Sequence, residues 1–173
     1  KSELEEVEVG QLVTENLELV FHAMRATKPF KVQINKKIKN LSPFMIYRKN
    51  LARVFINVFE NAFYAMREKS DVTSENDYIP ILNITLSEKN DMAELAIRDN
   101  GIGISKSHIE KVLIPFFTTK KNEGTGLGLS MANDIVTQKH EGDFLIESEE
   151  GRYTEIIIKI PLNLTGVAHE QVG

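Results

Sequence analysis

The sequence predicts a two-layer α/β sandwich, in which a mixed and mostly antiparallel sheet is covered on one face by helices. Strand-like alternation occurs in adjacent pairs of segments, at 79–86 with 92–98 and at 144–147 with 153–160. Such pairs are typical of antiparallel hairpins. Helical periodicity appears in the segments around and between these pairs. Three longer helices are expected at residues 11–25, 51–67 and 127–138.

The remaining elements are weaker in the sequence. A strand is expected at 31–38 because Val32, Ile34 and Ile38 share one face. Pro161 is expected to end the closing strand of the sheet. The other expected elements are a strand at 7–9, a loop at 68–77, a short helix from its cap at Ser105 to Val112, and a loop at 114–123.

The composition fits one domain, at residues 1–161, followed by a flexible tail at 162–173. The chain has 173 residues, of which 42% are hydrophobic, and this is enough to form a core. A net charge of −4 gives no reason to expect a nucleic-acid partner. No segment approaches the roughly 18 consecutive apolar residues of a membrane helix, so we expect no membrane contact by this domain.

Two further features of the sequence concern its context. It contains no cysteine, which excludes disulfides and fits a reducing cytoplasm. It begins with Lys1 rather than Met, so we expect a fragment of a longer protein. The expected location is cytoplasmic, although the parent protein could be anchored in a membrane.

The helix expected at 51–67 is apolar nearly all round, which predicts that it is buried. Its polar residues nevertheless share one face, and two asparagines, Asn57 and Asn61, stand one turn apart on it. A polar face is often only the solvent side of an amphipathic helix. Two asparagines flanked by Phe and Ala instead favour a binding role, because amide oxygens are suitable ligands for a hard cation such as Mg²⁺, which also holds phosphates.

Two glycine-rich loops suggest a nucleotide site. Asp99-Asn100-Gly101-Ile102-Gly103 follows an expected strand, and its carboxylate beside glycines suits the amino edge of a purine. Gly124-Thr125-Gly126-Leu127-Gly128-Leu129 opens an expected helix, where free N–H groups would cradle phosphate. Neither loop is specific alone, because the second lacks the lysine of a Walker loop and the Rossmann spacing. An isolated glycine cluster is more often a turn or hinge.

Four motifs together resemble those of the histidine-kinase catalytic domain. Asn57-x-x-x-Asn61-Ala62 resembles its N box, and Asp99-x-Gly101-x-Gly103 resembles its first glycine box. Pro115-Phe116-Phe117-Thr118-Thr119-Lys120 resembles its F box, and the loop 124–129 resembles its second glycine box. The motifs occur in the family's order, and the resemblance covers residues 7–161. It implies the Bergerat fold, shared with gyrase, mismatch-repair and heat-shock chaperone ATPases, and it implies ATP and Mg²⁺ as cofactors.

Position 57 favours the kinase branch of this group. In the hydrolysing members, a water-activating glutamate stands four residues before the metal-binding asparagine. Here that residue is Asn57, whose amide cannot act as a general base. Glu60 has the wrong helical offset for that role and is explained at least as well as a partner of Arg53 or of a neighbouring loop.

The resemblance also implies individual site residues. Asn57 is expected to be catalytic, and Asn61 is expected to hold the metal. Many members carry Lys or Arg where this chain has Tyr64, so Lys120 is a candidate substitute contact to phosphate or simply a solvated lysine. The full set of expected ATP-binding residues is Asn57, Asn61, Tyr64, Asp99, Gly101, Gly103, Lys120, Gly124, Thr125, Gly126, Leu127, Gly128, Leu129 and Thr154.

The phosphoacceptor is expected to lie outside this sequence. None of the four histidines, at positions 22, 108, 140 and 169, has the sequence context of the family's acceptor motif. The resemblance therefore implies an upstream helical dimerisation and phosphoacceptor domain, and a response regulator downstream. The alternative is a Bergerat-type ATPase clamp or an anti-sigma-like protein-serine kinase. A helical acceptor domain upstream would favour the histidine kinase.

Overall fold

The computed structural model describes residues 3–28, 30–73, 77–115 and 128–164. The N-terminal half contains β1 (Glu5–Val7), α1 (Val9–Thr27), β2 (Gln33–Ile38), β3 (Phe44–Ile46) and α2 (Arg48–Val72). The remaining elements are β4 (Ile81–Lys89), β5 (Met92–Asp99), α3 (Lys106–Ile109), α4 (Gly128–Asp134), the π-helical turn η1 (Ile135–Lys139), β6 (Asp143–Glu149) and β7 (Tyr153–Pro161).

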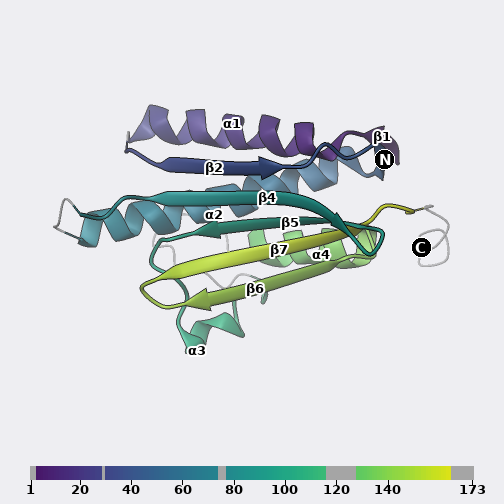
Figure 1. Ribbon diagram of the computed structural model, residues 1–173. Coiled ribbons are helices and arrows are strands. Elements are labelled where there is room, and N and C mark those ends of the chain that lie inside the picture. The colour runs from purple at the N-terminus through teal and green to yellow at the C-terminus, as the bar shows by residue number, and fades with distance from the viewer. Residues whose placement is uncertain (1–2, 29, 74–76, 116–127, 165–173) are drawn as a thin grey trace.

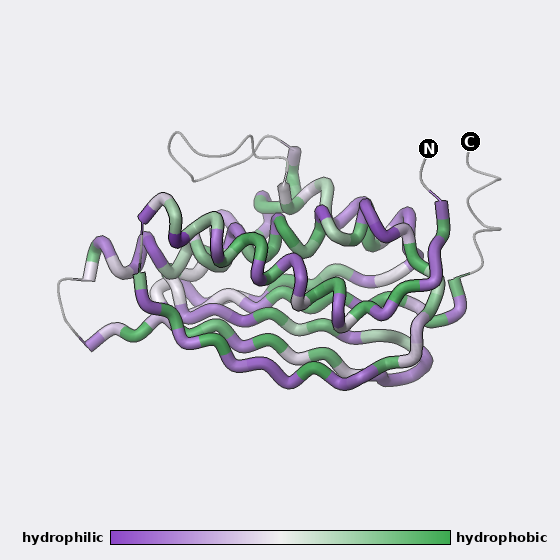
Figure 2. The backbone as a smooth tube through the Cα atoms, turned by 90° about the horizontal axis from the view of Figure 1, so that it is seen from above, coloured by the Kyte–Doolittle hydropathy of each residue, from purple (hydrophilic) through white to green (hydrophobic). Residues whose placement is uncertain are grey.

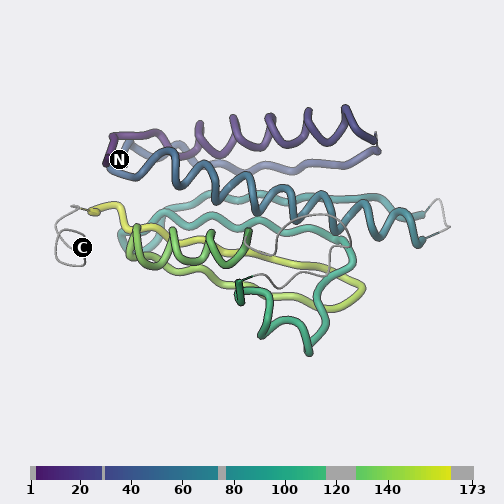
Figure 3. The backbone as a smooth tube through the Cα atoms, turned by 180° about the vertical axis from the view of Figure 1, so that it is seen from behind, coloured from purple at the N-terminus to yellow at the C-terminus, as the bar shows by residue number. Residues whose placement is uncertain are grey.

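The main sheet has five strands in the order β2-β4-β5-β7-β6 (Figure 1). The β2–β4 pair is parallel, and the other three pairs are antiparallel. From behind, α1, α2 and α4 lie on one face of this sheet (Figure 3). Seen from above, helices and strands form two layers along which hydrophobic and hydrophilic residues alternate (Figure 2). The predicted α/β sandwich, with its mixed and mostly antiparallel sheet, is confirmed.

Helix α2 forms the centre of the core, as its apolar sequence predicts. Its buried side chains are Leu51, Val54, Phe55, Val58, Phe59, Ala62, Phe63 and Met66. The helix is longer than the predicted 51–67, because it runs from Arg48 to Val72. The loop expected at 68–77 therefore begins only after Val72. Residues 68–71 continue the helix because they extend a core-packed segment, and two of them, Glu68 and Lys69, are good helix formers.

The N-terminal region differs from the prediction in its boundaries. The first strand is Glu5–Val7 rather than 7–9, and α1 already begins at Val9. The Glu8 carboxylate caps that helix by accepting hydrogen bonds from the N–H groups of Gly10 and Gln11, each at 2.9 Å. Strand β3 was not predicted. It is only three residues long and pairs with β1 in a separate ribbon, which short local patterns cannot reveal.

Both predicted hairpins are present. The β4–β5 turn consists of Asn90 and Asp91, whose positive φ angles of 53° and 59° suit a two-residue turn of the type I′ class. Gly151 lies at the β6–β7 turn with φ +80°. The C-terminal residues 162–164 still pack against the domain, because Leu164 is buried and the Leu162 N–H donates to the Asp91 carbonyl. The rest of the expected tail, 165–173, lies outside the described residues.

The segments around the second glycine loop agree only in part. The helix expected from Ser105 to Val112 is the four-residue α3, which ends at Ile109, and the Ser105 hydroxyl makes no capping hydrogen bond. The helix expected at 127–138 consists of α4 and then the wider turn η1. Most of the loop expected at 114–123 falls outside the described residues, as does the F box after Pro115.

Candidate nucleotide site

The two asparagines predicted to share a face of α2 are adjacent there. The Asn61 Nδ2 donates to the Asn57 backbone carbonyl at 2.9 Å. A carbonyl can only accept, so this bond orients the Asn61 amide and leaves its Oδ1 to face other partners. No described residue donates a hydrogen bond to that oxygen. Both side chains are half-buried, and Tyr64, two residues before Met66, is half-buried on the same helix.

The Asn57 side chain connects α2 to the start of α4. Its Nδ2 lies 3.5 Å from the carbonyl oxygen of Gly128, the first residue of that helix. Leu129 follows and packs against the core. Gly124, Thr125, Gly126, Leu127 and Lys120 belong to the predicted site but lie outside the described residues.

Asp99 is a buried carboxylate at the end of β5, with a relative exposure of 4%. One of its oxygens accepts the Gly101 N–H at 2.8 Å. Burial raises the pKa of Asp99 to about 7, while the Gly101 N–H and the Lys69 charge act in the opposite direction. Such a group changes charge near neutral pH, and perturbed groups of this kind are concentrated at functional sites.

Thr154 lies beside Asp99 on the neighbouring strand. The two residues are register partners in the β5–β7 pair, and Thr154 is buried. Its hydroxyl is 3.0 Å from the Ser148 hydroxyl on β6. Ser148 also donates to the Tyr153 carbonyl and accepts the Ile104 N–H. A hydroxyl network thus connects β7, the strand that pairs with that of Asp99, with the loop that follows Asp99.

The two glycines of the first box permit close packing within the protein. A Cβ on Gly101 would lie 2.5 Å from the backbone carbonyl carbon of Ala65 on α2. Gly103 has φ +68°, and a Cβ there would overlap the backbone carbonyl of Glu149. We expected these glycines to bring the backbone close to a ligand. In the structure they bring the loop close to α2 and to the end of β6.

The structure therefore brings the predicted residues together in two groups. Asp99, Gly101 and Thr154 meet at the ends of β5 and β7, and Asn57, Asn61 and Gly128 meet between α2 and α4. Both groups border α2, because the Ile102 N–H donates to the Ala65 carbonyl at 3.2 Å. The residues that support the first glycine loop were not predicted from the sequence. These are Ala65, Lys69, Tyr78, Ser148 and Gly151, and only Gly151, a glycine between two predicted strands, carried a local signal.

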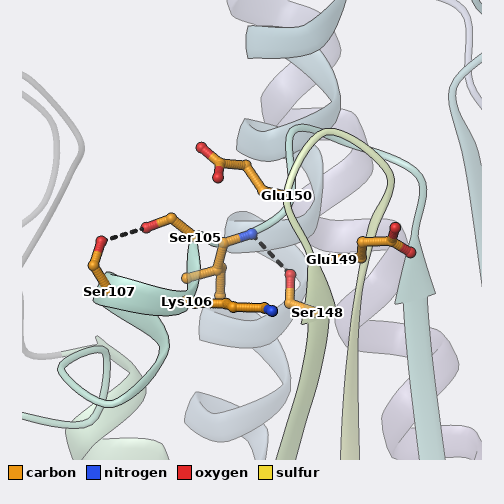
Figure 4. Close-up of a pocket in the computed structure, with 7 residues that line it drawn as sticks. Ser105, Lys106, Ser107, Ser148, Glu149 and Glu150 are labelled. Carbon is orange, nitrogen blue, oxygen red and sulfur yellow. Dashed lines mark hydrogen bonds between the residues drawn. The ribbon is translucent and has the colours of Figure 1, made fainter.

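A hollow of about 440 Å³ adjoins the same loop (Figure 4). Ile104, Ser105, Lys106 and Ser107 line one side, and Ser148, Glu149 and Glu150 line the other. None of the predicted nucleotide residues within the described ranges lines it. We therefore base the site on the buried Asp99 and the α2 asparagines.

The donor set on α2 fits Mg²⁺ held jointly with phosphate. Asn61 offers a neutral amide oxygen, and a magnesium ion at nucleotide sites takes one or two protein oxygens together with phosphates and waters. In the described part of the chain, no cluster of three or more His, Asp or Glu side chains could hold a metal ion by itself, without a bound nucleotide. A metal here would therefore depend on the nucleotide for most of its coordination.

The comparison with protein families identifies the class of this domain. Residues 47–164, more than half of the chain, match the model of the histidine kinase-, DNA gyrase B- and HSP90-like ATPase family. The chain belongs to this ATPase family, and its resemblance to the histidine-kinase catalytic domain is confirmed.

Several curated relatives of the chain are named as kinases. The chain is 28% identical over 158 residues to Sporulation kinase E of Bacillus subtilis, covering 91% of this chain and 20% of that protein. It is 27% identical over 163 residues to sensor histidine kinase ZraS of Escherichia coli, covering 94% of this chain and 32% of that protein. It is 31% identical over 166 residues to the signal transduction histidine-protein kinase AtoS of Escherichia coli, covering 95% and 25%. The chain thus spans a third or less of these curated relatives.

A solved structure gives the same class. The nucleotide-free catalytic domain of histidine kinase ThkA superposes with a TM-score of 0.73 at 25% identity, covering 92% of this chain and 98% of that one. None of the helices within the described ranges has both the length and the apolar character needed to cross a membrane.

Proposed function

We propose that this chain is the ATP-binding catalytic domain of a two-component sensor histidine kinase. Asp99 would accept a hydrogen bond from the exocyclic amine of adenine, and Thr154 would lie beside it. Asn57 and Asn61 would face the phosphates, with Asn61 holding Mg²⁺. Lys120 and the loop 124–129 would contact the phosphates. Three findings support this assignment. They are the ATPase family, the relatives that are named as kinases, and the position of both residue groups beside α2.

The chemistry would be transfer of the γ-phosphoryl group to a histidine of the upstream dimerisation domain. The lone pair of a neutral imidazole nitrogen forms the new N–P bond, and the bond from phosphorus to the bridging oxygen breaks. ADP leaves with that electron pair, and the other ring nitrogen releases its proton to solvent. A bound Mg²⁺ would neutralise charge on the phosphates, since this reaction depends on positioning and charge stabilisation.

The observation that carries the kinase assignment is the amide at position 57. It lies 3.5 Å from the Gly128 carbonyl, between α2 and α4, where the hydrolysing branch is expected to carry glutamate. An amide can orient a group there but cannot take a proton from water. The domain would therefore protect bound ATP from hydrolysis until an acceptor histidine approaches. A response regulator would then receive the phosphoryl group, and the domain would work in the cytoplasm.

Phosphotransfer tests this assignment. The chain alone is incubated with Mg²⁺ and γ-labelled ATP, and then with the parent protein's helical domain. We expect slow hydrolysis and no self-labelling by the chain alone, and an acid-labile, base-stable phosphoprotein once the helical domain is added. Rapid turnover by the chain alone would favour an ATPase clamp. An acid-stable phosphoserine on a partner would favour the serine-kinase alternative.

A further inference from the structure

Lys69 connects three elements that surround the first glycine loop. It lies near the C-terminal end of α2, and its Nζ donates to the Gly151 carbonyl at 2.9 Å. The same ammonium lies 4.9 Å from the centre of the Tyr78 ring. A lysine that holds both a backbone carbonyl and an aromatic face has less freedom than a solvated one.

The β6–β7 turn, which Lys69 contacts, is hydrogen-bonded to the first glycine loop. The Gly151 N–H donates to the Ile102 carbonyl at 2.6 Å, and the Ile102 N–H donates to Ala65 on α2. Two residues later, the Ile104 N–H donates to the Ser148 hydroxyl at 2.8 Å. These hydrogen bonds link α2 through Lys69 to the β6–β7 turn, the turn to the glycine loop, and the glycine loop back to α2.

Tyr78 supports the other side of the same loop. Its hydroxyl donates to the carbonyl of Asn100, the residue after Asp99, at 3.0 Å. The Asn100 side chain accepts from the Ile81 N–H and donates to the Ile79 carbonyl. Burial, together with the Asp99 carboxylate, raises the pKa of Tyr78 above its usual range, so its hydroxyl stays protonated as a donor.

We propose that Lys69 is a positioning residue for purine recognition, because its ammonium holds the Asp99 loop between α2 and the β6–β7 turn and supplies the positive charge that acts on the buried carboxylate. The proposal rests on the proposed function, in which Asp99 accepts the adenine amine. Lys69 itself would touch neither the nucleotide nor the reacting atoms.

The groups around Asp99 make Lys69 the source of the positive charge that acts on this carboxylate. Helix α2 contributes Lys69, the segment before β4 contributes Tyr78, and the loop contributes the Gly101 N–H. The facing strand positions are Leu82 on β4 and Thr154 on β7, which carry no charge. At the β6–β7 turn, Arg152 and Glu149 pair with each other at 3.1 Å and Glu150 is exposed, and Arg98 on β5 pairs with Glu155 at 3.6 Å.

The decisive variant is Lys69→Met, which keeps the length of the side chain and removes its charge and hydrogen bond. The matched control is Lys49→Met, an exposed lysine on the same helix and about 30 Å away along its axis. Lys69→Arg restores the charge. Affinity for ADP is measured by calorimetry between pH 6 and pH 9, and amide exchange is measured at Ile102 and Ile104.

We expect wild-type affinity to rise with pH and to level off above about pH 8, because the carboxylate form accepts the amine. In Lys69→Met the midpoint should move up by about 0.5 to 1 pH unit, which lowers affinity at pH 7 by roughly two- to fivefold and leaves a smaller loss at pH 9. Exchange at Ile102 and Ile104 should become faster. Lys69→Arg and Lys49→Met should follow the wild-type profile.

A loss of affinity that is equal at every pH, or no loss at all, would overturn the role of Lys69. The separate variant Asp99→Asn distinguishes this failure from that of the proposed function. If Asp99→Asn weakens ADP binding while Lys69→Met does not shift the profile, only the inference about Lys69 fails. If Asp99→Asn binds ADP as wild type does, the assignment of Asp99 fails first.

Discussion

Gly101 lies so close to Ala65 that a Cβ added to it would be 2.5 Å from the Ala65 carbonyl carbon. Since that neighbour is helix backbone, it cannot move aside as a flexible side chain would. Gly101→Ala should lower the free energy of unfolding by about 1–3 kcal/mol and shift the first glycine loop away from α2. Urea unfolding measures the first effect, and ADP affinity measures the second.

Gly128→Ala is the matched control for this prediction. Among the described residues, the atoms nearest to a Cβ at Gly128 belong to the Asn57 side chain, at the ordinary contact distance of 3.6 Å. Within a helix, alanine is favoured over glycine by up to about 1 kcal/mol, so stability should be unchanged or higher. A stable Gly128→Ala that has lost ATP affinity would show that this glycine is needed for the ligand. Equal destabilisation by the two variants would contradict the packing argument.

Asp99→Asn should weaken ATP binding by tenfold or more. The change replaces a carboxylate, which only accepts hydrogen bonds, with an amide, and removes a charge-assisted bond of about 1.5–3 kcal/mol. GTP, which presents a carbonyl where adenine has an amine, should bind poorly to wild type. Calorimetry with both nucleotides measures these affinities, and an unchanged ATP affinity in the variant would remove Asp99 from the site.

The same carboxylate should make the nucleotide-free domain less stable at high pH. Burial raises the pKa of Asp99 from 3.8 when unfolded to about 7 when folded, so the folded state binds this proton more tightly. The resulting stabilisation is complete below pH 3.8 and is lost as pH rises through about 7. Asp99→Asn lacks this titration. We expect the free energy of unfolding of Asp99→Asn to exceed that of wild type, and we expect this difference to be about 1–4 kcal/mol larger at pH 8 than at pH 5.

Urea unfolding of both proteins at the two pH values measures this difference. Glu94→Gln makes the same acid-to-amide change at a less buried position of the same strand and serves as the control, for which we expect a weaker dependence on pH. A variant Asp99→Asn whose advantage is constant with pH would show that the buried group is already charged at pH 5.

Asn61→Ala should weaken ATP binding in the presence of Mg²⁺ much more than in EDTA. Its Oδ1 is the oxygen that we assign to the metal, while its Nδ2 only supports the helix through Asn57. The affinity ratio of variant to wild type is measured in both conditions by calorimetry. Equal losses with and without the metal would make Asn61 a structural residue.

His140 should contribute strongly to stability although it is not part of the predicted boxes. It is fully buried, its Nε2 accepts the Tyr47 N–H at 3.1 Å, and its Nδ1 lies 3.0 Å from the Ile135 carbonyl. His140→Ala leaves a cavity and removes the side-chain partner of the Tyr47 N–H, while the Ile135 carbonyl keeps the backbone N–H of residue 140 as a donor, so we expect a loss of about 2–4 kcal/mol in free energy of unfolding. The exposed His22 gives the control, since His22→Ala should cost less than about 0.5 kcal/mol. Equal costs would contradict this role.

Much of the fold could be predicted because its signals are local. The alternation in β4 and β5 and the apolar periodicity of α2 follow directly from which face each side chain buries. The ends of α2 and the existence of β3 could not be predicted in this way. They depend on partners distant in sequence, since β3 is a strand only where it pairs with β1.

The sequence by itself determined the class of the domain, the pairing of Asn57 with Asn61 on one helix face, and the carboxylate at the end of β5. These are properties of residue type and spacing, which are set within a few turns or residues. Only the tertiary structure decided that Gly101 packs against Ala65, that Asp99 is buried enough to titrate near neutral pH, and that Lys69 reaches Gly151. Burial and long-range contact depend on how α2 lies against the sheet, and no local spacing encodes that arrangement.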